Sequence, residues 1–196
     1  VTEVESVEGQ LFDRYETRMG LRYFEFSAEK GFSLNGKPVK INGVCLHHDF
    51  GCLGSAFNKN AARRQLEILK EMGCNAIRTS HNPPAPELLD LCDEMGLLVI
   101  DEMFDEWRVP KVENGYFQYF DKHAETDATA VIHRDMNHPS VFAWSIGNEL
   151  PEFREGDSGA ETAKMLSDIC HREDPTRPTT IATIPVGYAD GYPRNL

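Results

Sequence analysis

Polar side chains occur at four places in this sequence where an apolar, strand-like segment ends. In folds built from parallel strands and helices, the residues that do chemistry lie where strands end and loops begin, so these groups are expected to share one rim. Together they offer carboxylate, imidazole and amide groups, which suit proton transfer. The groups are His47, His48 and Asp49; Arg78, Ser80, His81 and Asn82; Asp101 and Glu102; and Asn148 and Glu149.

Glu149 is the strongest candidate for proton transfer. It directly follows the apolar strand exit Trp144-Ser145-Ile146-Gly147-Asn148, and no lysine lies nearby in the sequence. A carboxyl group at such a place is expected to be partly desolvated, which favours its neutral form and suits a general acid. The alternative is a glutamate at the start of a helix that stabilises the helix dipole. The residues alone leave both interpretations open.

The elements that would position these residues alternate between strand and helix after an all-strand beginning. Residues 1–28 alternate loosely between apolar and polar, which predicts one or two strands, and Asn35-Gly36 predicts a hairpin turn. Apolar residues at helical spacing, followed by Gly73 and Gly96, predict two helices. The predicted helices cover residues 60–72, 86–95 and 121–136 and a stretch that begins at Ser158, and the predicted strands cover 39–46, 75–78, 97–100, 141–144 and 180–183.

Two of the predicted units nearly repeat each other. Glu71-Met72-Gly73 precedes one strand, and Glu94-Met95-Gly96 precedes the next strand 23 residues further on. Such helix–glycine–strand units indicate βα units arranged around one sheet. An eight-stranded barrel needs about 250 residues. The 196 residues therefore predict an α/β fold of about five βα-type units or parts of them. If the fold is a barrel, it is a partial (β/α)8 TIM barrel with about the first four to five βα units.

The composition excludes several classes of partner. Hydrophobic residues make up 40% and charged residues 27%, which is ordinary for a folded domain. The net charge of −12 repels phosphate, so no nucleic acid partner is expected. No apolar run approaches the ~18 residues that span a bilayer, so no membrane association is expected. No leader-like segment follows Val1, and the sequence does not decide between the bacterial cytoplasm and the periplasm.

The five cysteines do not form a recognisable framework. Their number is odd and no CxxC pair occurs, so neither a disulfide scaffold nor a zinc site is predicted. We expect free, mostly packing residues. A lone catalytic cysteine is the alternative, although none has a recognisable nucleophile setting. The five are Cys45, Cys52, Cys74, Cys92 and Cys170.

Four motifs resemble one enzyme family, the family 2 glycoside hydrolases, which include β-galactosidases, β-glucuronidases and β-mannosidases. The stretch from His138 to Glu149 resembles the acid/base signature of that family. The similarity covers roughly residues 10 to 180, and the sequence of residues 101–107 most resembles that of bacterial β-galactosidases. The other motifs are Asn42-Gly43-Val44 with His47, the stretch 75–83, and the stretch 91–97 that leads into Asp101-Glu102.

The resemblance implies a role for seven residues. Glu149 would protonate the glycosidic oxygen and then activate water. Asn148 would hydrogen-bond the sugar 2-hydroxyl, a contact that strengthens in an oxocarbenium-like transition state. The other five would line the substrate site, each with a structural role at a strand end as the alternative: His47, His81, Arg78, Asp101 and Glu102.

Two departures from the family pattern bear on the chemistry. The family's nucleophile is a second glutamate after the seventh strand, whereas this sequence ends near the fifth, at Leu196. A retaining mechanism needs two carboxyl groups about 5–5.5 Å apart, so we expect the chain alone to be inactive. Some β-galactosidases bind magnesium through a Glu-x-His pair after the third strand. Here Glu106 is followed by Arg108 at that spacing, so no metal and no cofactor is expected.

The resemblance also divides the chain. Residues 1–28 would be the end of the immunoglobulin-like β-sandwich domain that precedes the barrel in this family, and residues 29–180 the N-terminal part of the catalytic TIM barrel. Residues 181–196 are atypical, because the stretch from Ile181 to Arg194 resembles a segment of alanine racemase. A fusion or assembly junction near Thr179 is one interpretation of this tail, and chance similarity is the other. A pyridoxal-phosphate racemase is a further functional alternative, and the tail is the only part of the sequence that supports it.

The leading hypothesis is therefore a retaining β-galactosidase-type enzyme that hydrolyses terminal β-D-galactosides and is present here in part. β-Glucuronidase or β-mannosidase activity is the alternative within the family. A non-catalytic carbohydrate-binding or structural fragment is the alternative outside it. A carbohydrate substrate is the expected partner. Because an incomplete barrel exposes strand edges and apolar helix faces, a homo-oligomer or association with the remainder of a parent chain is also expected.

Overall fold

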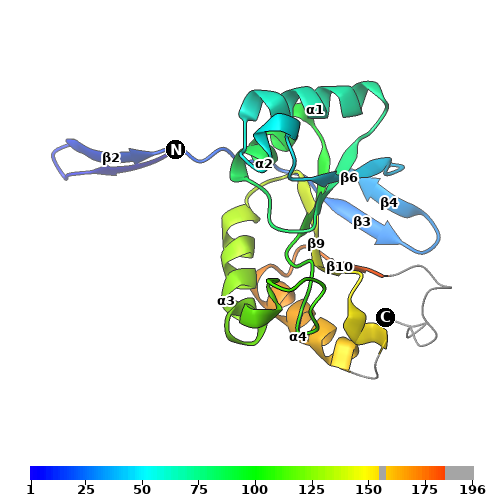
Figure 1. Ribbon diagram of the computed structural model, residues 1–196. Helices are drawn as coiled ribbons and strands as arrows, with labels where there is room; N and C mark the ends of the chain where they lie inside the picture. The colour runs from blue at the N-terminus through cyan, green and yellow to red at the C-terminus, as the bar shows by residue number, and fades with distance from the viewer. Residues whose placement is uncertain (155–157, 184–196) are drawn as a thin grey trace.

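The computed structural model describes residues 1–154 and 158–183, and its centre is a parallel sheet of five strands (Figure 1). The strands lie side by side in the order in which they occur in the chain, and each pairs in parallel with the next. Successive parallel neighbours joined by helices are the pattern of a barrel wound in one direction, as predicted. The strands are β6 (Gly43–His47), β7 (Ala76–Ser80), β8 (Leu98–Glu102), β9 (Val141–Asn148) and β10 (Thr179–Ala182).

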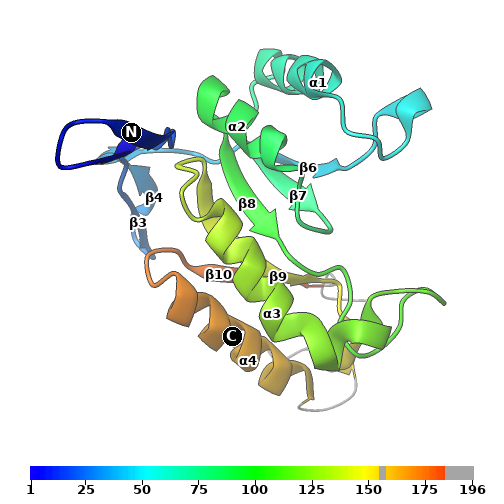
Figure 2. The ribbon, with the colours of Figure 1, turned by 90° about the vertical axis from the view of Figure 1, so that its left-hand side faces the viewer.

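The four predicted helices are present (Figure 2). The side chain of Asn58 caps the first by accepting hydrogen bonds from two main-chain N–H groups. Gly96 ends the second in the left-handed conformation, with φ +72°. The third begins four residues before the predicted position, because the loop residue Glu106 accepts a hydrogen bond from the main-chain nitrogen of Phe117. The helices are α1 (Lys59–Glu71), α2 (Pro86–Met95), α3 (Phe117–Asp135) and α4 (Ser158–Glu173), with short 3-10 turns η1 (Gly51–Leu53) and η2 (Pro151–Arg154).

One large apolar cluster lies between the sheet and these helices. Strand residues such as Val99 and Trp144 pack there against helix residues such as Leu66, Leu89 and Ile132, all of them fully buried. Removing this much apolar surface from water is the main stabilising contribution to the fold, at roughly 25 cal/mol per Å². It fixes which face of each strand points toward the helices. The alternate residues of the same strands point to the other face, toward the interior of the partial barrel.

A small antiparallel sheet covers the amino-terminal end of the central strands. It consists of β3 (Phe24–Ser27), β4 (Gly31–Leu34) and β5 (Lys37–Pro38), with the predicted turn at Asn35-Gly36. Phe32 from this sheet packs with Leu98 and Phe142, which lie near the starts of their strands. Val39 and Ile41 pack against the same cluster, and β6 begins at Gly43, four residues after the predicted start at residue 39. The opposite, carboxyl-terminal end carries the predicted site.

The first residues form a separate hairpin of β1 (Thr2–Glu5) and β2 (Leu11–Tyr15), which projects away from the rest of the molecule in Figure 1. All of its strand residues are exposed. The expected immunoglobulin-like domain remains a prediction. The predicted boundary at residue 28 falls inside the β3–β4 hairpin, so residues on either side of it share one sheet. Most of the racemase-like tail, residues 184–196, lies outside the described residues.

The cysteines are free thiols, as predicted. Burial raises the pKa of both Cys92 and Cys170 to about 12, so these two are protonated packing residues at neutral pH. Within residues 1–154 and 158–183, no helix is long and apolar enough to cross a membrane. The same part of the chain contains no cluster of three or more His, Cys, Asp or Glu side chains suited to a metal ion.

Candidate active site

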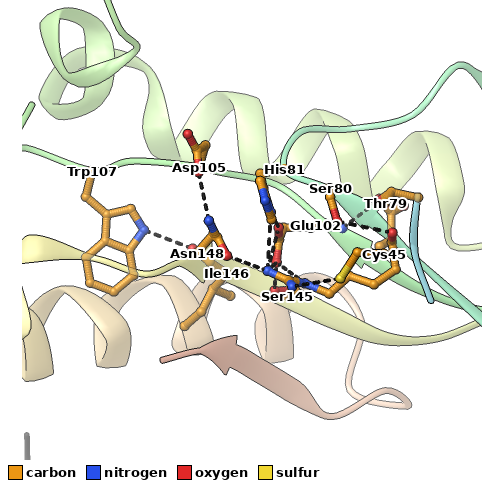
Figure 3. A network of polar contacts seen from close by, with 12 residues as sticks. Cys45, Thr79, Ser80, His81, Glu102, Asp105, Trp107, Ser145, Ile146 and Asn148 are labelled. Carbon is orange, nitrogen blue, oxygen red and sulfur yellow. Dashed lines mark hydrogen bonds and ion pairs between the residues drawn. The ribbon is translucent and has the colours of Figure 1, made fainter. Parts of the chain in front are cut away.

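Glu102, the last residue of β8, is the fully buried centre of a polar network at the carboxyl end of the sheet (Figure 3). Its Oε2 accepts hydrogen bonds from Arg78 Nε at 2.7 Å and from Ser145 Oγ at 2.5 Å. Its Oε1 lies 2.9 Å from Arg78 Nη2 and 2.7 Å from His81 Nδ1. A buried carboxylate is tolerated only when its oxygens are satisfied in this way.

Arg78, from the middle of β7, pairs with both oxygens of Glu102 through two guanidinium nitrogens. Such a planar, two-point contact fixes the guanidinium more firmly than a single bond would. Burial disfavours the charged form of Arg78, but the hydrogen bonds and charge of Glu102 outweigh this and raise its pKa above the ordinary value. Arg78 is therefore a fixed cation, and its guanidinium also contacts Cys45 Sγ, His81 Nδ1 and Asn148 Oδ1.

Asn148, the last residue of β9, is held on both sides of its amide. Its Oδ1 accepts a hydrogen bond from Arg78 Nη2 at 2.7 Å, and its Nδ2 donates to Asp105 Oδ1 at 3.0 Å. An amide nitrogen carries two hydrogens and Asp105 takes one, so the second has no partner among residues 1–154 and 158–183 and can serve a ligand. The network thus orients a hydrogen-bond donor at the carboxyl end of the sheet.

Lys111 reaches the same strand end from the loop between β8 and α3. Its Nζ donates to the main-chain oxygen of Asn148 at 2.6 Å and to Asp105 Oδ1 at 2.9 Å. No lysine lies near Glu149 in the sequence, but the fold brings Lys111 against the main chain of the preceding residue, Asn148. Burial raises the pKa of Asp105, but the hydrogen bonds from Lys111 and Asn148 outweigh it, so its pKa lies below the ordinary value.

Glu149 follows Asn148 at the point where the chain leaves the sheet. Its φ is +43°, a left-handed conformation that is uncommon for a residue with a side chain and that occurs more often at functional sites. Its main-chain nitrogen donates to the oxygen of Ala182 at 2.8 Å. Gly147 is required just before the turn, because a side chain there would meet Leu150 at 2.6 Å and Trp107 at 3.0 Å.

The expected desolvation of Glu149 is not observed in this structure, where the residue is exposed. The reason is that the five described parallel strands form an open sheet, and β10 covers the Glu149 main chain without covering its side chain. In the part of the chain that the structure describes, the Glu149 carboxyl group is therefore open to solvent.

The two predicted histidines lie next to each other. The rings of His47, at the end of β6, and His81, after β7, are 5.0 Å apart and nearly perpendicular. His81 is part of the Glu102 network, whereas His47 is exposed. Both are positioned beside the cation and carboxylate at the carboxyl end of the sheet, where the predicted rim lies.

Of the seven residues to which the resemblance gives a role, Asp101 is the one that the fold does not bring to this rim. It precedes Glu102 on β8 and therefore points to the opposite face, toward α3, where it is fully buried. Thr79 Oγ1 donates to its Oδ1 at 3.4 Å. Burial, together with the charge of Asp135, raises its pKa well above the ordinary value. We therefore leave Asp101 out of the candidate site.

Glu106 and Arg108, in the loop after β8, do not fit a cation site. Both oxygens of the buried Glu106 accept main-chain N–H groups, from Lys111 and Phe117. Arg108 is itself a cation and bonds to Asp121 and Thr162. A divalent ion needs several oxygen ligands that are not already occupied.

Comparison with known proteins decides the family. Residues 27–187 match the family described as "Glycosyl hydrolases family 2, TIM barrel domain". The chain belongs to glycosyl hydrolase family 2. The family 2 match begins in β3, runs through all five parallel strands and extends to residue 187, past the predicted boundary at residue 180.

Three relatives illustrate the range within family 2. The chain is 58% identical over 156 residues to "Beta-galactosidase BoGH2A" of Bacteroides ovatus, covering 80% of this chain and 18% of that protein. It is 34% identical over 178 residues to a β-glucuronidase of Bacteroides fragilis, covering 90% and 25%. The crystal structure of a β-glycosidase from Bacteroides vulgatus superposes with a TM-score of 0.85 at 42% identity, covering 94% of this chain and 23% of that one. The chain thus spans about a fifth to a quarter of the length of these family 2 relatives.

Three network residues were not assigned a role from the sequence. Ser145 lies inside the apolar run of β9, and its inward position follows from strand alternation once Glu102 is known to face it. Asp105 belongs to a motif that resembles family 2, although the motif does not reveal its bond to Asn148. Lys111 lies in an irregular loop, and no local signal in the sequence reveals its contact with β9.

Proposed function

We propose that this chain carries the acid/base part of a retaining β-glycosidase site that acts on terminal β-D-galactosides. Glu149 donates its proton to the glycosidic oxygen as the bond between that oxygen and the anomeric carbon breaks. The resulting carboxylate later takes a proton from the water that releases the sugar. The second carboxylate, the nucleophile, comes from a part of the enzyme beyond the described residues.

The arrangement of Asn148 is the observation that carries this proposal. Its amide is fixed by Arg78 and Asp105, and one hydrogen on Nδ2 is left for the sugar 2-hydroxyl. Glu149 follows directly in a left-handed turn. A preorganised donor next to a proton-transfer group is what an oxocarbenium-like transition state requires.

A neutral sugar fits this network better than a uronate. The two cations of the network, Arg78 and Lys111, are already paired with Glu102 and Asp105. A glucuronide would need a cation for its own carboxylate, and this network leaves neither one unpaired. The 58% identity to a protein named β-galactosidase supports the same choice. The β-glucuronidases among the relatives keep glucuronides as the second candidate, because their sequences also match most of this chain.

The test uses a chimera in which residues 27–183 replace the matched segment of the B. ovatus relative. It is expected to hydrolyse nitrophenyl β-D-galactoside in preference to the glucuronide and the mannoside. Glu149→Ala should lower kcat by about 10²–10⁴-fold for substrates with poor leaving groups. The loss should be smaller for a dinitrophenyl leaving group, which needs no proton. Added azide should restore turnover by replacing the activated water.

Glu161→Gln on the exposed face of α4 is the matched control and should leave turnover unchanged. The 196-residue chain alone should show no turnover. A chimera that binds galactosides but does not hydrolyse them would favour the non-catalytic alternative. Equal losses for good and poor leaving groups, without azide rescue, would contradict the role of Glu149.

A further inference from the structure

Two carboxyl groups are buried behind the candidate site, on the side of the sheet that faces α3. They belong to Asp101 on β8 and to Asp135, the last residue of α3, and both residues are completely excluded from solvent. A hydrogen bond joins the two carboxyl groups, which requires that one of them carries a proton. Two buried carboxylates in contact repel each other too strongly for both to be ionised.

The arginine beside this pair decides which carboxyl group is ionised. Arg134 donates to Oδ1 of Asp135 at 2.7 Å and to Oδ2 at 2.6 Å, a two-point contact that favours a carboxylate. Asp101 Oδ2 meets no hydrogen-bond donor among residues 1–154 and 158–183. Its strand neighbours, Thr79 and Trp144, are uncharged. Burial and the charge of Asp135 outweigh the charge of Arg134 and raise the pKa of Asp101, so the proton belongs to Asp101.

With its proton, Asp101 both accepts and donates a hydrogen bond, which places it inside a chain of bonds that begins at Glu102. The main-chain N–H of Glu102 donates to Thr79 Oγ1 at 2.9 Å. The Thr79 hydroxyl donates to Asp101 Oδ1 at 3.4 Å, and Asp101 donates its own proton to Asp135. Each group thus donates to the next, and the last acceptor is the carboxylate that Arg134 holds. Hydrogen bonds that run in one direction polarise and strengthen one another.

A second contact joins the buried pair to the loop after β7. Arg134 Nη2 donates to the main-chain oxygen of Pro84 at 3.0 Å. Pro84 lies three residues after His81, whose Nδ1 is 2.7 Å from Glu102 Oε1. The pair therefore supports the polar network from behind at two places, the main chain of Glu102 and the loop that carries His81.

We propose that Asp101 is a positioning residue for the candidate site and that it acts as a neutral acid. It holds Glu102 by way of the Thr79 hydroxyl, and Glu102 in turn fixes the guanidinium that orients Asn148. An ionised Asp101 has no proton to donate to Asp135, so its ionisation breaks the chain. As far as it concerns turnover, this inference rests on the proposed function, because it assumes that Asn148 meets the sugar.

The first test reads the protonation state and the chain of bonds by NMR of the isotopically labelled 196-residue chain, without substrate. The carboxyl carbon of Asp101 should show the protonated form at pH 7. Thr79→Val and Asp101→Leu break the chain and should shift the signals of the Glu102 main-chain amide and the Asn148 side-chain amide.

Two further variants control for a general effect on folding. Asp101→Asn should keep the parent signals of Glu102 and Asn148, because its amide accepts and donates as the neutral acid does. Thr179→Val is the matched control for the lost hydroxyl. It removes a bond to Ser167 at the start of β10 and should leave both signals unchanged. The titration of the parent chain needs no variant and stays informative if Asp101→Leu does not fold.

The second test measures galactoside hydrolysis by the chimera with the B. ovatus relative between pH 6 and pH 9. Asp101→Leu and Thr79→Val should lower kcat/KM by about 10–100-fold, because a small displacement of a positioning group costs that much. Asp101→Asn should recover most of this loss. The ratio of its kcat/KM to that of the parent should rise with pH, because only the parent can ionise at this position. Glu149 titrates in both proteins, so its contribution cancels in the ratio.

The results that would overturn the inference differ in what they say about the function. An ionised Asp101 at pH 7, or unchanged Glu102 and Asn148 signals in both disrupting variants, would refute the positioning role and leave the proposed function standing. A ratio that stays constant with pH would refute the role of the proton. If the NMR results are as expected but the parent chimera does not hydrolyse galactosides, the proposed function fails, and the role of Asp101 in turnover fails with it.

Discussion

The ammonium group of Lys111 lies 2.6 Å from the main-chain oxygen of Asn148, although 37 residues separate the two in the sequence. The same group lies 2.9 Å from Asp105, whose carboxylate holds the Asn148 side chain. Lys111 therefore supports both the main chain and the side chain of the residue that precedes Glu149.

Removal of this cation is expected to raise the pKa of Asp105. Burial already favours the neutral acid there, and the hydrogen bond from Lys111 opposes it. In Lys111→Met the opposing contribution is lost, so the carboxyl signal of Asp105 should titrate at higher pH in carbon-detected NMR. Because Asp105 is 40% exposed, solvent screening should limit the loss in free energy of unfolding to about 1 kcal/mol. Lys111→Arg keeps the charge and serves as the control, and an unchanged titration in the Met variant would contradict this role.

The pairing of Arg78 with Glu102 predicts a larger effect on stability. Arg78→Met leaves the fully buried Glu102 without its cation, and such unpaired buried charges cost about 3–5 kcal/mol. Glu102→Gln should cost less, about 1–3 kcal/mol, because Arg78 is partly exposed and keeps its bond to Asn148. Chemical denaturation of the chain and both variants measures the difference. A Met variant as stable as the Gln variant would argue against a charge-paired centre.

His138 and Asp93 form a pair that predicts a pH dependence of stability. Their atoms are 2.7 Å apart, and Asp93 also accepts the main-chain N–H of Ser140, which fixes the start of β9. The hydrogen bond that His138 donates to Asp93 outweighs burial and raises the pKa of His138. For Asp93, burial is outweighed by the bonds from His138 and Ser140, so its pKa is lowered.

The signs of the two shifts define the pH window. A raised histidine pKa stabilises the fold below the ordinary histidine value near 6.5, and this contribution is lost as the pH rises through the raised pKa. A lowered aspartate pKa stabilises the fold above the ordinary aspartate value near 3.8, and this contribution is lost as the pH falls through the lowered pKa. His138→Gln should therefore cost about 1–3 kcal/mol near pH 5 and less at pH 9, as measured by thermal unfolding. His133→Gln changes a more exposed pair with Glu173 and should have a smaller effect. A cost for His138→Gln that does not vary with pH would exclude the ion pair as its source.

Asp101 predicts a loss of stability with rising pH that arises from burial and not from an ion pair. Its pKa is raised by burial and by the neighbouring Asp135, so the folded state holds a proton that the unfolded state releases. The chain should therefore lose stability as the pH rises above the ordinary aspartate value. Asp101→Asn removes this dependence and should be more stable than the parent at pH 8, by on the order of 1 kcal/mol or more. Asp168→Asn, on the exposed face of α4, should show no such gain. A larger benefit of the Asn variant at pH 5 than at pH 8 would contradict a protonated Asp101.

The sequence by itself was sufficient for the order of the elements and for most of the rim. Helical periodicity and the glycines after α1 and α2 predicted those helices to within a residue, because local capping and burial of one face decide such elements. Apart from Asp101, the site residues predicted at the ends of β6, β7, β8 and β9 lie at one end of the sheet, because parallel strands expose their carboxyl ends on the same side. The motif resemblance predicted the family that the comparison confirmed.

Only the tertiary structure decided which neighbours share the site. Asp101 and Glu102 are adjacent in sequence and equally polar, but strand alternation sends one toward α3 and the other toward Arg78, and the packing of the helices determines which is which. The contact of Lys111 depends on the path of an irregular loop, which no periodic pattern encodes. The exposure of Glu149 depends on the surface that surrounds a strand end, which is a property of the assembled sheet and not of the residues beside it in the chain.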